Sequence, residues 1–164
     1  MATLEDPVVL DLSRGRVPVG GSCVEIGSTY AAVYRTLAGF PEEPAHQWRE
    51  QGGISGERYD FDASFLGYPH PHGIEFVFKN GRLVRIESSD PEGIATGIEP
   101  NSKERVDELR AEWAERLGPA TESHDFGEND RVSRWRVGPL DLIVYLESRT
   151  PSLGIAVQEA GREG

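Results

Sequence analysis

The sequence predicts an α+β fold made of two helix-plus-antiparallel-hairpin units, with the helices packed on one face of a mostly antiparallel sheet. Three observations lead to this prediction. Two segments have helical patterns, a glycine ends each of them, and alternating apolar segments follow each glycine. The order recurs as a first pseudo-repeat over residues 22–90 and a second over 95–160, and periods of this length are typical of tandem supersecondary units. We therefore expect residues 1–164 to form a single domain with two similar halves.

The first half begins with an apolar run at residues 4–12, which predicts a strand. Residues 14–21 contain glycine and proline, which predict a loop. A helix should start near Ser28 or Thr29, because either hydroxyl can accept a hydrogen bond from an amide of the first turn. Its apolar residues continue to Leu37.

A polar connection follows this helix. Gly39 and Pro41 should end the helix, and residues 42–56 should form a loop that Trp48 anchors to the core. The next segment, 58–62, alternates aromatic and acidic residues, as expected of a strand.

The most specific local signal is a hairpin. Residues 74–78 and 83–86 flank Asn80 and Gly81, a pair that readily adopts the positive φ angles of a tight turn. Alternation places three apolar side chains on one face of the hairpin. These residues are Ile74, Phe76 and Phe78.

The second helix has a capping-box pattern, with Asn101 at the N-cap and Glu104 three residues later. Gly118 and Pro119 should end it. Its apolar residues recur at spacings of three or four, which predicts one buried stripe. The stripe consists of Val106, Leu109, Trp113 and Leu117.

Three strands should follow the second helix. Residues 131–137 and 140–146 are separated by Gly138 and Pro139, so we expect an antiparallel pair. Residues 153–157 should form the last strand.

Composition narrows the classes of function. The chain carries 28 acidic and 17 basic residues, and its net charge of −11 disfavours nucleic-acid binding. No segment approaches the roughly 18 apolar residues of a membrane span, and the N-terminal residues do not resemble a signal peptide. With one cysteine, which cannot form an intramolecular disulfide, these features predict a cytoplasmic protein without membrane association. The acidic surface either attracts a basic partner or keeps the protein soluble.

Catalytic signatures are missing from the sequence. Cys23 has no neighbouring base, so we interpret it as a buried structural thiol rather than a nucleophile. The glycine-rich residues 52–56 lack the lysine of a phosphate-binding loop. We therefore predict a protein that is not an enzyme, with no catalytic residue and no cofactor.

One histidine pair has the spacing of metal ligands. In an extended chain, His70 and His72 would point to the same side. A metal would need further ligands, from His46, His124 or Asp60. Because no adequate ligand set accompanies the pair, we predict a proline-stiffened loop and no metal site.

Two groups of aromatic and acidic residues are candidates for partner binding. Tyrosine rings bury contact area at low entropic cost, and carboxylates guide the encounter with a basic protein. The alternative is that each group is a solvated loop. The candidate residues are Tyr59, Asp60, Asp62, Tyr68, Glu122, Asp125, Glu128 and Asp130.

The repeated order of capped helix, Leu-Gly stop and hairpins resembles that of tandem β-lactamase-inhibitor-protein-like units. The matching segments cover most of residues 24–157. They are Glu25-Ile-Gly-Ser-Thr with Leu37-Ala-Gly39, and Gly97-Ile-Glu-Pro-Asn-Ser with Leu117-Gly-Pro119. The layout also resembles that of the small acidic α+β immunity proteins that accompany bacterial toxins, and this second resemblance implies a role in toxin inhibition.

These observations favour a non-enzymatic acidic protein-binding module, most concretely an intracellular immunity protein that occludes a basic toxin domain. The alternative is a small-molecule-binding or enzymatic α+β domain with its ligand between helices and sheet, near Trp48, Tyr68, His70 and His72. The sequence leaves the identity of the partner or ligand, the binding face and the oligomeric state open.

Overall fold

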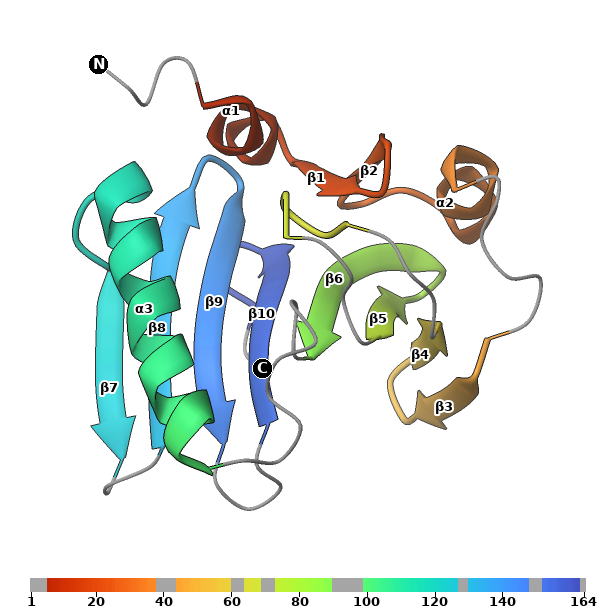
Figure 1. The fold of residues 1–164 in the computed structure, drawn as a ribbon. Coiled ribbons are helices and arrows are strands. Elements are labelled where there is room, and N and C mark those ends of the chain that lie inside the picture. The colour runs from red at the N-terminus through yellow and green to blue at the C-terminus, as the bar shows by residue number, and fades with distance from the viewer. Residues whose placement is uncertain are drawn as a thin grey trace.

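The computed structural model describes residues 6–37, 44–59, 64–68, 73–89, 99–126, 130–147 and 152–162. Within these residues the protein is mostly β (Figure 1). The helices are α1 (Pro7–Ser13), α2 (Tyr30–Thr36) and α3 (Glu99–Leu117). The strands are β1 (Arg16–Val19), β2 (Ser22–Glu25), β3 (His46–Glu50), β4 (Ile54–Tyr59), β5 (Gly73–Lys79), β6 (Arg82–Ser89), β7 (Glu122–Phe126), β8 (Asp130–Val137), β9 (Leu140–Glu147) and β10 (Ser152–Glu159).

One antiparallel sheet dominates the molecule. Its eight strands lie in the order β3-β4-β5-β6-β10-β9-β8-β7, and β1 and β2 form a separate two-stranded ribbon. The predicted fold of two helix-plus-hairpin units is therefore wrong, because both halves contribute four strands to one sheet. The halves meet where β6 pairs with β10, with Ile86 opposite Val157. An isolated hairpin leaves two edges of unpaired backbone groups, and joining the halves removes one edge from each.

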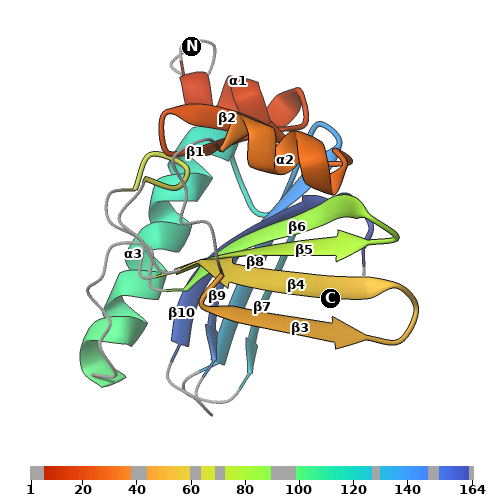
Figure 2. The same cartoon turned by 90° about the vertical axis from the view of Figure 1, so that its right-hand side faces the viewer.

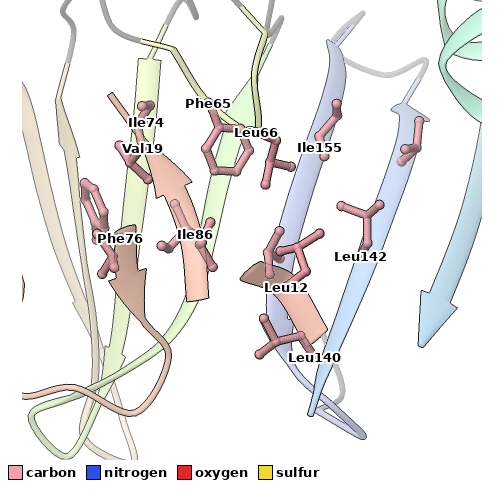
Figure 3. Packing of buried hydrophobic residues seen from close by; sticks show 14 of the residues in the cluster. Leu12, Val19, Phe65, Leu66, Ile74, Phe76, Ile86, Leu140, Leu142 and Ile155 are labelled. Carbon is pink, nitrogen blue, oxygen red and sulfur yellow. The ribbon is translucent and has the colours of Figure 1, made fainter. Parts of the chain in front are cut away.

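Helices and the β1–β2 ribbon lie against the sheet. Helix α3 packs against β8, β9 and β10, whereas α2 contacts β2 and β6. Figures 1 and 2 show α1, the ribbon and α2 lying across one end of the sheet. The core fills the space between these elements and the sheet. Its buried members, several of which are shown in Figure 3, include Leu12, Val19, Phe65, Leu66, Ile74, Phe76, Ile86, Leu140, Leu142 and Ile155.

The predicted β5–β6 hairpin is confirmed. Lys79 pairs with Arg82 across a two-residue turn. Both turn residues have positive φ, 52° for Asn80 and 79° for Gly81, as a type I′ turn requires. The three predicted core side chains of β5 are buried: Ile74, Phe76 and Phe78.

The two predicted helices are present, with different ends. Helix α2 ends at Thr36 with Leu37 as its C-cap, and the predicted stop at Gly39 and Pro41 lies outside the described residues. Thr29 caps α2, since its hydroxyl accepts a hydrogen bond from the amide of Ala32 at 3.3 Å. Helix α3 starts at Glu99, so Asn101 lies within its first turn and is not the N-cap. Gly118, with a φ of 86°, follows its last residue as predicted. In the apolar stripe, Val106, Leu109 and Trp113 are fully buried and Leu117 is partly buried.

The predicted strand at residues 4–12 is wrong, because Pro7–Ser13 is helical. The Asp6 carboxylate accepts hydrogen bonds from the amides of Val8 and Val9 at 3.1 and 3.3 Å. Pro7 then occupies the first turn, where its missing N–H costs nothing. Asp6 followed by Pro7 is a sequence signal for the start of a helix. The prediction was wrong because it relied on the apolar run, which also fits a strand.

Three segments predicted to be irregular are strands. Residues 42–56 contain β3 and the start of β4, joined by a turn in which Gly52 and Gly53 have positive φ. Residues 14–21 contain β1, and the connection after α3 contains β7. All three lie at the edge of a sheet or ribbon, where polar residues and proline are tolerated, so their composition resembles that of loops.

Asp6 also joins the N-terminal helix to α3. Its two carboxylate oxygens accept hydrogen bonds from Arg116 Nε and Nη2 at 2.6 and 2.7 Å. The guanidinium of Arg116 holds the pKa of Asp6 below its ordinary value, although partial burial opposes this effect. The ionised form of Asp6 is therefore the form that stabilises the fold.

We expect Asp6→Asn to lower the free energy of unfolding by about 1 to 2 kcal/mol at pH 7, because asparagine keeps the helix cap but loses the paired charge. A pKa lowered by folding means that stability is gained as the pH rises and is lost as the pH falls below the ordinary Asp range. The difference between wild type and Asp6→Asn should therefore shrink towards pH 2. Urea unfolding at both pH values checks this. A difference that is the same at both pH values would contradict the assignment.

Candidate functional site

A buried carboxylate with three tyrosine partners is the most unusual polar group of the described residues. Glu57 lies on β4 and is only 7% exposed. The start of α2 is fixed over this part of the sheet, because the amide of Tyr30 donates to the carbonyl of Gly81 in the β5–β6 turn. Tyr30 and Tyr34 are one helical turn apart and therefore share the face of α2 that lies over Glu57.

Four polar groups lie within hydrogen-bonding distance of the Glu57 carboxylate. Oε1 accepts from Tyr30 Oη at 2.7 Å and from Gln47 Nε2 at 2.9 Å. Oε2 accepts from Tyr34 Oη and lies 3.0 Å from Tyr59 Oη, which is also 2.7 Å from Tyr34 Oη. The four groups come from α2, β3 and β4, so the carboxylate joins the edge of the sheet to the helix above it.

The site stays anionic although it is buried. Burial raises the pKa of Glu57, but the hydrogen bonds from the three tyrosines and Gln47 outweigh this effect, and the pKa lies below its ordinary value. Burial and the neighbouring Glu57 charge raise the pKa of Tyr34 far above its usual range. Near neutral pH the cluster therefore consists of one carboxylate and neutral phenols.

A pocket of about 440 Å³ opens beside this carboxylate, a volume within the range of small-molecule sites. It lies between Tyr30 of α2 and the β3–β4 hairpin. Tyr30 is 46% exposed, so part of its ring is accessible to solvent. The hairpin residues that line the pocket include Gln47, Arg49, Glu50, Ser55 and Glu57.

The structure separates the tyrosines that the sequence grouped together. Tyr59 is 2% exposed and belongs to the Glu57 cluster, so its ring is in the core and does not reach solvent. Tyr68 is half-buried, and its hydroxyl donates to Glu112 of α3 at 3.1 Å. It lines a second pocket, of about 460 Å³, between α3 and the N-terminal segment. Asp60 and Asp62 lie outside the described residues.

The second predicted group lies at the opposite edge of the sheet. Glu122 and Asp125 are exposed on the edge strand β7, and Asp130 is half-buried at the start of β8. Asp125 pairs with Arg110 of α3 at 3.0 Å and with Arg131 at 3.8 Å. Glu128 lies outside the described residues.

The other predicted candidates have local contacts or lie outside the described residues. Trp48 lies over Gly56 on the opposite face of β4 from Glu57, and its indole N–H donates to Glu75 at 2.9 Å. Cys23 is half-buried rather than buried, and its thiol lies 3.5 Å from an Asp11 oxygen. Burial and Asp11 raise the pKa of this thiol, which disfavours the reactive thiolate. The His70–His72 pair lies outside the described residues.

Sequence reasoning missed Glu57, Tyr30 and Tyr34. The available signal was the spacing of Tyr30 and Tyr34, which places two rings with polar tips on one face of a helix. Glu57 itself gives no such signal, since a single acidic residue in a polar strand resembles any exposed side chain.

In the described part of the chain, no group of three or more His, Cys, Asp or Glu side chains is arranged to hold a metal ion. None of the helices in these ranges combines the length and apolar composition needed to cross a bilayer.

Comparisons with known proteins identify the fold only. No protein-family model and no curated protein sequence matches this chain. The crystal structure of YjgB, a DUF4309 family protein from Bacillus subtilis, has a TM-score of 0.55 to this structure over 96% of both chains, with 15% sequence identity. A cysteine-rich secretory protein from Staphylococcus aureus has a TM-score of 0.46 and 10% identity. That match covers 82% of this chain and 44% of the other.

Proposed function

We propose that this protein is a non-enzymatic binding module for a basic protein partner, and that α3 and β7 form the contact surface. One observation carries the proposal: on this surface the carboxylates are outermost, whereas the arginines that pair with them are largely buried. An immunity protein that occludes a basic toxin domain is a concrete instance of such a module, and a cytoplasmic location fits that role.

In the ion pairs of α3, the acidic side chain is more exposed than the arginine with which it pairs. The Arg105 side chain is 15% exposed, and its partner Glu108 is 63% exposed. Arg110 is 18% exposed, whereas its partners Asp107 and Asp125 are 53% and 54% exposed. A basic partner therefore meets the acidic member of each pair first, and long-range attraction accelerates its association.

Strand β7 adds two features of a protein interface next to these acids. It is an edge strand that pairs only with β8, so the backbone groups of its other side have no partner strand among the described residues. Phe126 at its end is 59% exposed, an unusual position for a large apolar side chain, and stacks on His124 with ring centroids 5.8 Å apart. Aromatic residues beside a charged surface are typical anchors of protein complexes.

The proposal is tested with two triple variants of equal net charge. One neutralises Asp107, Glu108 and Asp125 on the α3–β7 surface. The matched control neutralises three exposed acids elsewhere, namely Glu25, Glu50 and Glu159. A pull-down from the native host with wild type and both variants identifies proteins that the surface variant alone fails to capture.

Binding kinetics with the captured partner then distinguish the effect of the acidic residues on the association rate from the effect of Phe126 on the dissociation rate. The surface variant should slow association by about tenfold and weaken its salt dependence, whereas the control should stay close to wild type. Phe126→Ala should speed dissociation. Equal effects of the two triple variants, an acidic partner, or an association rate that does not depend on salt would contradict the proposal.

A further inference from the structure

Glu57 is a buried charge that has no ion-pair partner among the described residues. Only two carboxylate residues in the described part of the chain are buried, Glu57 and Asp141. Asp141 has two cationic partners, with Arg136 Nε at 2.7 Å and Arg134 Nη1 at 3.9 Å. All the hydrogen-bond partners of Glu57 are neutral, and no lysine, arginine or histidine of the described ranges forms an ion pair with it.

Two other tyrosine-bonded carboxylates of the described residues each have an arginine partner. Glu87 accepts a hydrogen bond from Tyr145 and also pairs with Arg85 at 2.9 Å. Glu112 accepts from Tyr68 and also pairs with Arg105 at 3.4 Å. At Glu87 and Glu112 the carboxylate therefore has both a tyrosine and an arginine partner, whereas the hydrogen-bond partners of Glu57 are all neutral. Buried charges are ordinarily paired, because desolvation is costly.

The pocket beside Glu57 gives a cation access to this charge. Two other charged residues line the pocket, Arg49 on the Glu57 face of the hairpin and Glu50 on the opposite face. Both are exposed, so Glu57 is the one buried charge among the lining residues. The half-exposed ring of Tyr30 offers an aromatic surface next to the carboxylate, and a negative charge beside an aromatic ring suits a cationic group. Ser55 and Gln47 also line the pocket, and both residue types carry neutral acceptors for its N–H groups.

We propose that the pocket between α2 and the β3–β4 hairpin binds a monovalent organic cation, an alkylammonium or guanidinium group, with Glu57 as its counter-ion. The cation belongs either to a free small molecule or to a lysine or arginine side chain of another protein. This inference does not depend on the α3–β7 surface, because β3 and β7 form opposite edges of the sheet.

The test uses small probes of matched shape. Propylguanidinium and propylammonium are titrated into the full chain and followed by NMR chemical shifts, with the neutral isostere propylurea as the ligand control. The two cations should give saturable shifts at the β3–β4 hairpin that propylurea does not produce. Saturation by propylurea at equal concentration, or no saturable binding of either cation, would overturn the proposal.

Two variants assign the binding to Glu57. Glu57→Gln should weaken cation binding by at least tenfold, whereas the control Glu112→Gln, at a tyrosine-bonded carboxylate that already has an arginine, should leave it within twofold. Gln47→Lys keeps the Glu57 carboxylate and places an ammonium group opposite it. This variant should fold and should no longer bind the probes. It therefore tests the proposal even if Glu57→Gln is poorly folded. Binding that survives Gln47→Lys would overturn the proposal.

A last comparison identifies the source of the cation. Small cations that bind with affinity at least equal to that of an arginine-containing peptide indicate a free ligand. A peptide that binds at least tenfold more tightly than propylguanidinium, and loses this advantage in Glu57→Gln, indicates a side chain of a partner. Failure of both probes refutes the pocket while leaving the α3–β7 surface to its own test.

Discussion

Trp113→Ala is expected to lower the free energy of unfolding by about 3 to 5 kcal/mol, the usual cost of truncating a core tryptophan. The indole is 0% exposed and lies in the stripe with which α3 packs against the sheet. Its ring also contacts the Arg116 guanidinium, 4.1 Å from the ring centroid, and Arg116 in turn holds Asp6. Loss of the ring therefore removes core packing and loosens the link between α3 and α1.

Urea unfolding of the variant and of a control on the same helix measures this effect. Glu115→Ala is the control, since Glu115 is exposed on α3 and alanine also favours a helix. The control should change the stability by less than about 0.5 kcal/mol. If Trp113→Ala leaves the urea midpoint unchanged, then α3 does not use this stripe to pack on the sheet.

Gly138→Ala is expected to destabilise the protein by about 2 to 5 kcal/mol, as the sum of backbone strain and overpacking. Gly138 has a φ of 57° in the two-residue turn between β8 and β9, as the first central position of a type II′ turn requires. A Cβ atom at this position would lie 2.3 Å from the carbonyl oxygen of Ser13, at the end of α1. Backbone atoms cannot move aside as a flexible side chain does, so α1 or the turn must shift.

A second hairpin in the same sheet provides the matched control. Gly81 also has a positive φ, 79°, but a Cβ atom there would meet nothing within 4 Å. Gly81→Ala should therefore cost only the strain of the left-handed backbone, about 1 to 2 kcal/mol. Urea midpoints of the two variants give the comparison. Equal losses of stability would show that the contact with Ser13 has no energetic consequence.

Local signals predicted the elements that depend on neighbouring residues. The Asn80-Gly81 and Gly138-Pro139 turns, the Thr29 cap and the stripe around Trp113 were all recognisable, because each depends on residues at most a few positions apart. The edge strands were missed since their polar composition resembles that of loops. The N-terminal helix was missed since a short apolar run fits a strand or a buried helix equally well.

Candidate residues for binding were predicted less completely. Glu122 and Asp125, which are predicted to bind a partner, are exposed on β7. Tyr59 was predicted to contact a partner but is buried, because β4 places it on the face that α2 and the core cover. Acidic and aromatic composition indicates what a segment can contact, but not which face of the sheet it lies on.

The local turns, caps and apolar faces of this protein, together with its negative charge, follow from short-range features of the sequence. The pairing of β6 with β10 and the contacts of Glu57 with three tyrosines, two of them from α2, become visible only in the folded chain. The same holds for the arginines of α3, which lie beneath their acidic partners. The physical reason is that alternation in a strand specifies its two faces but not its neighbour, so contacts between distant residues follow from the order of strands in the sheet.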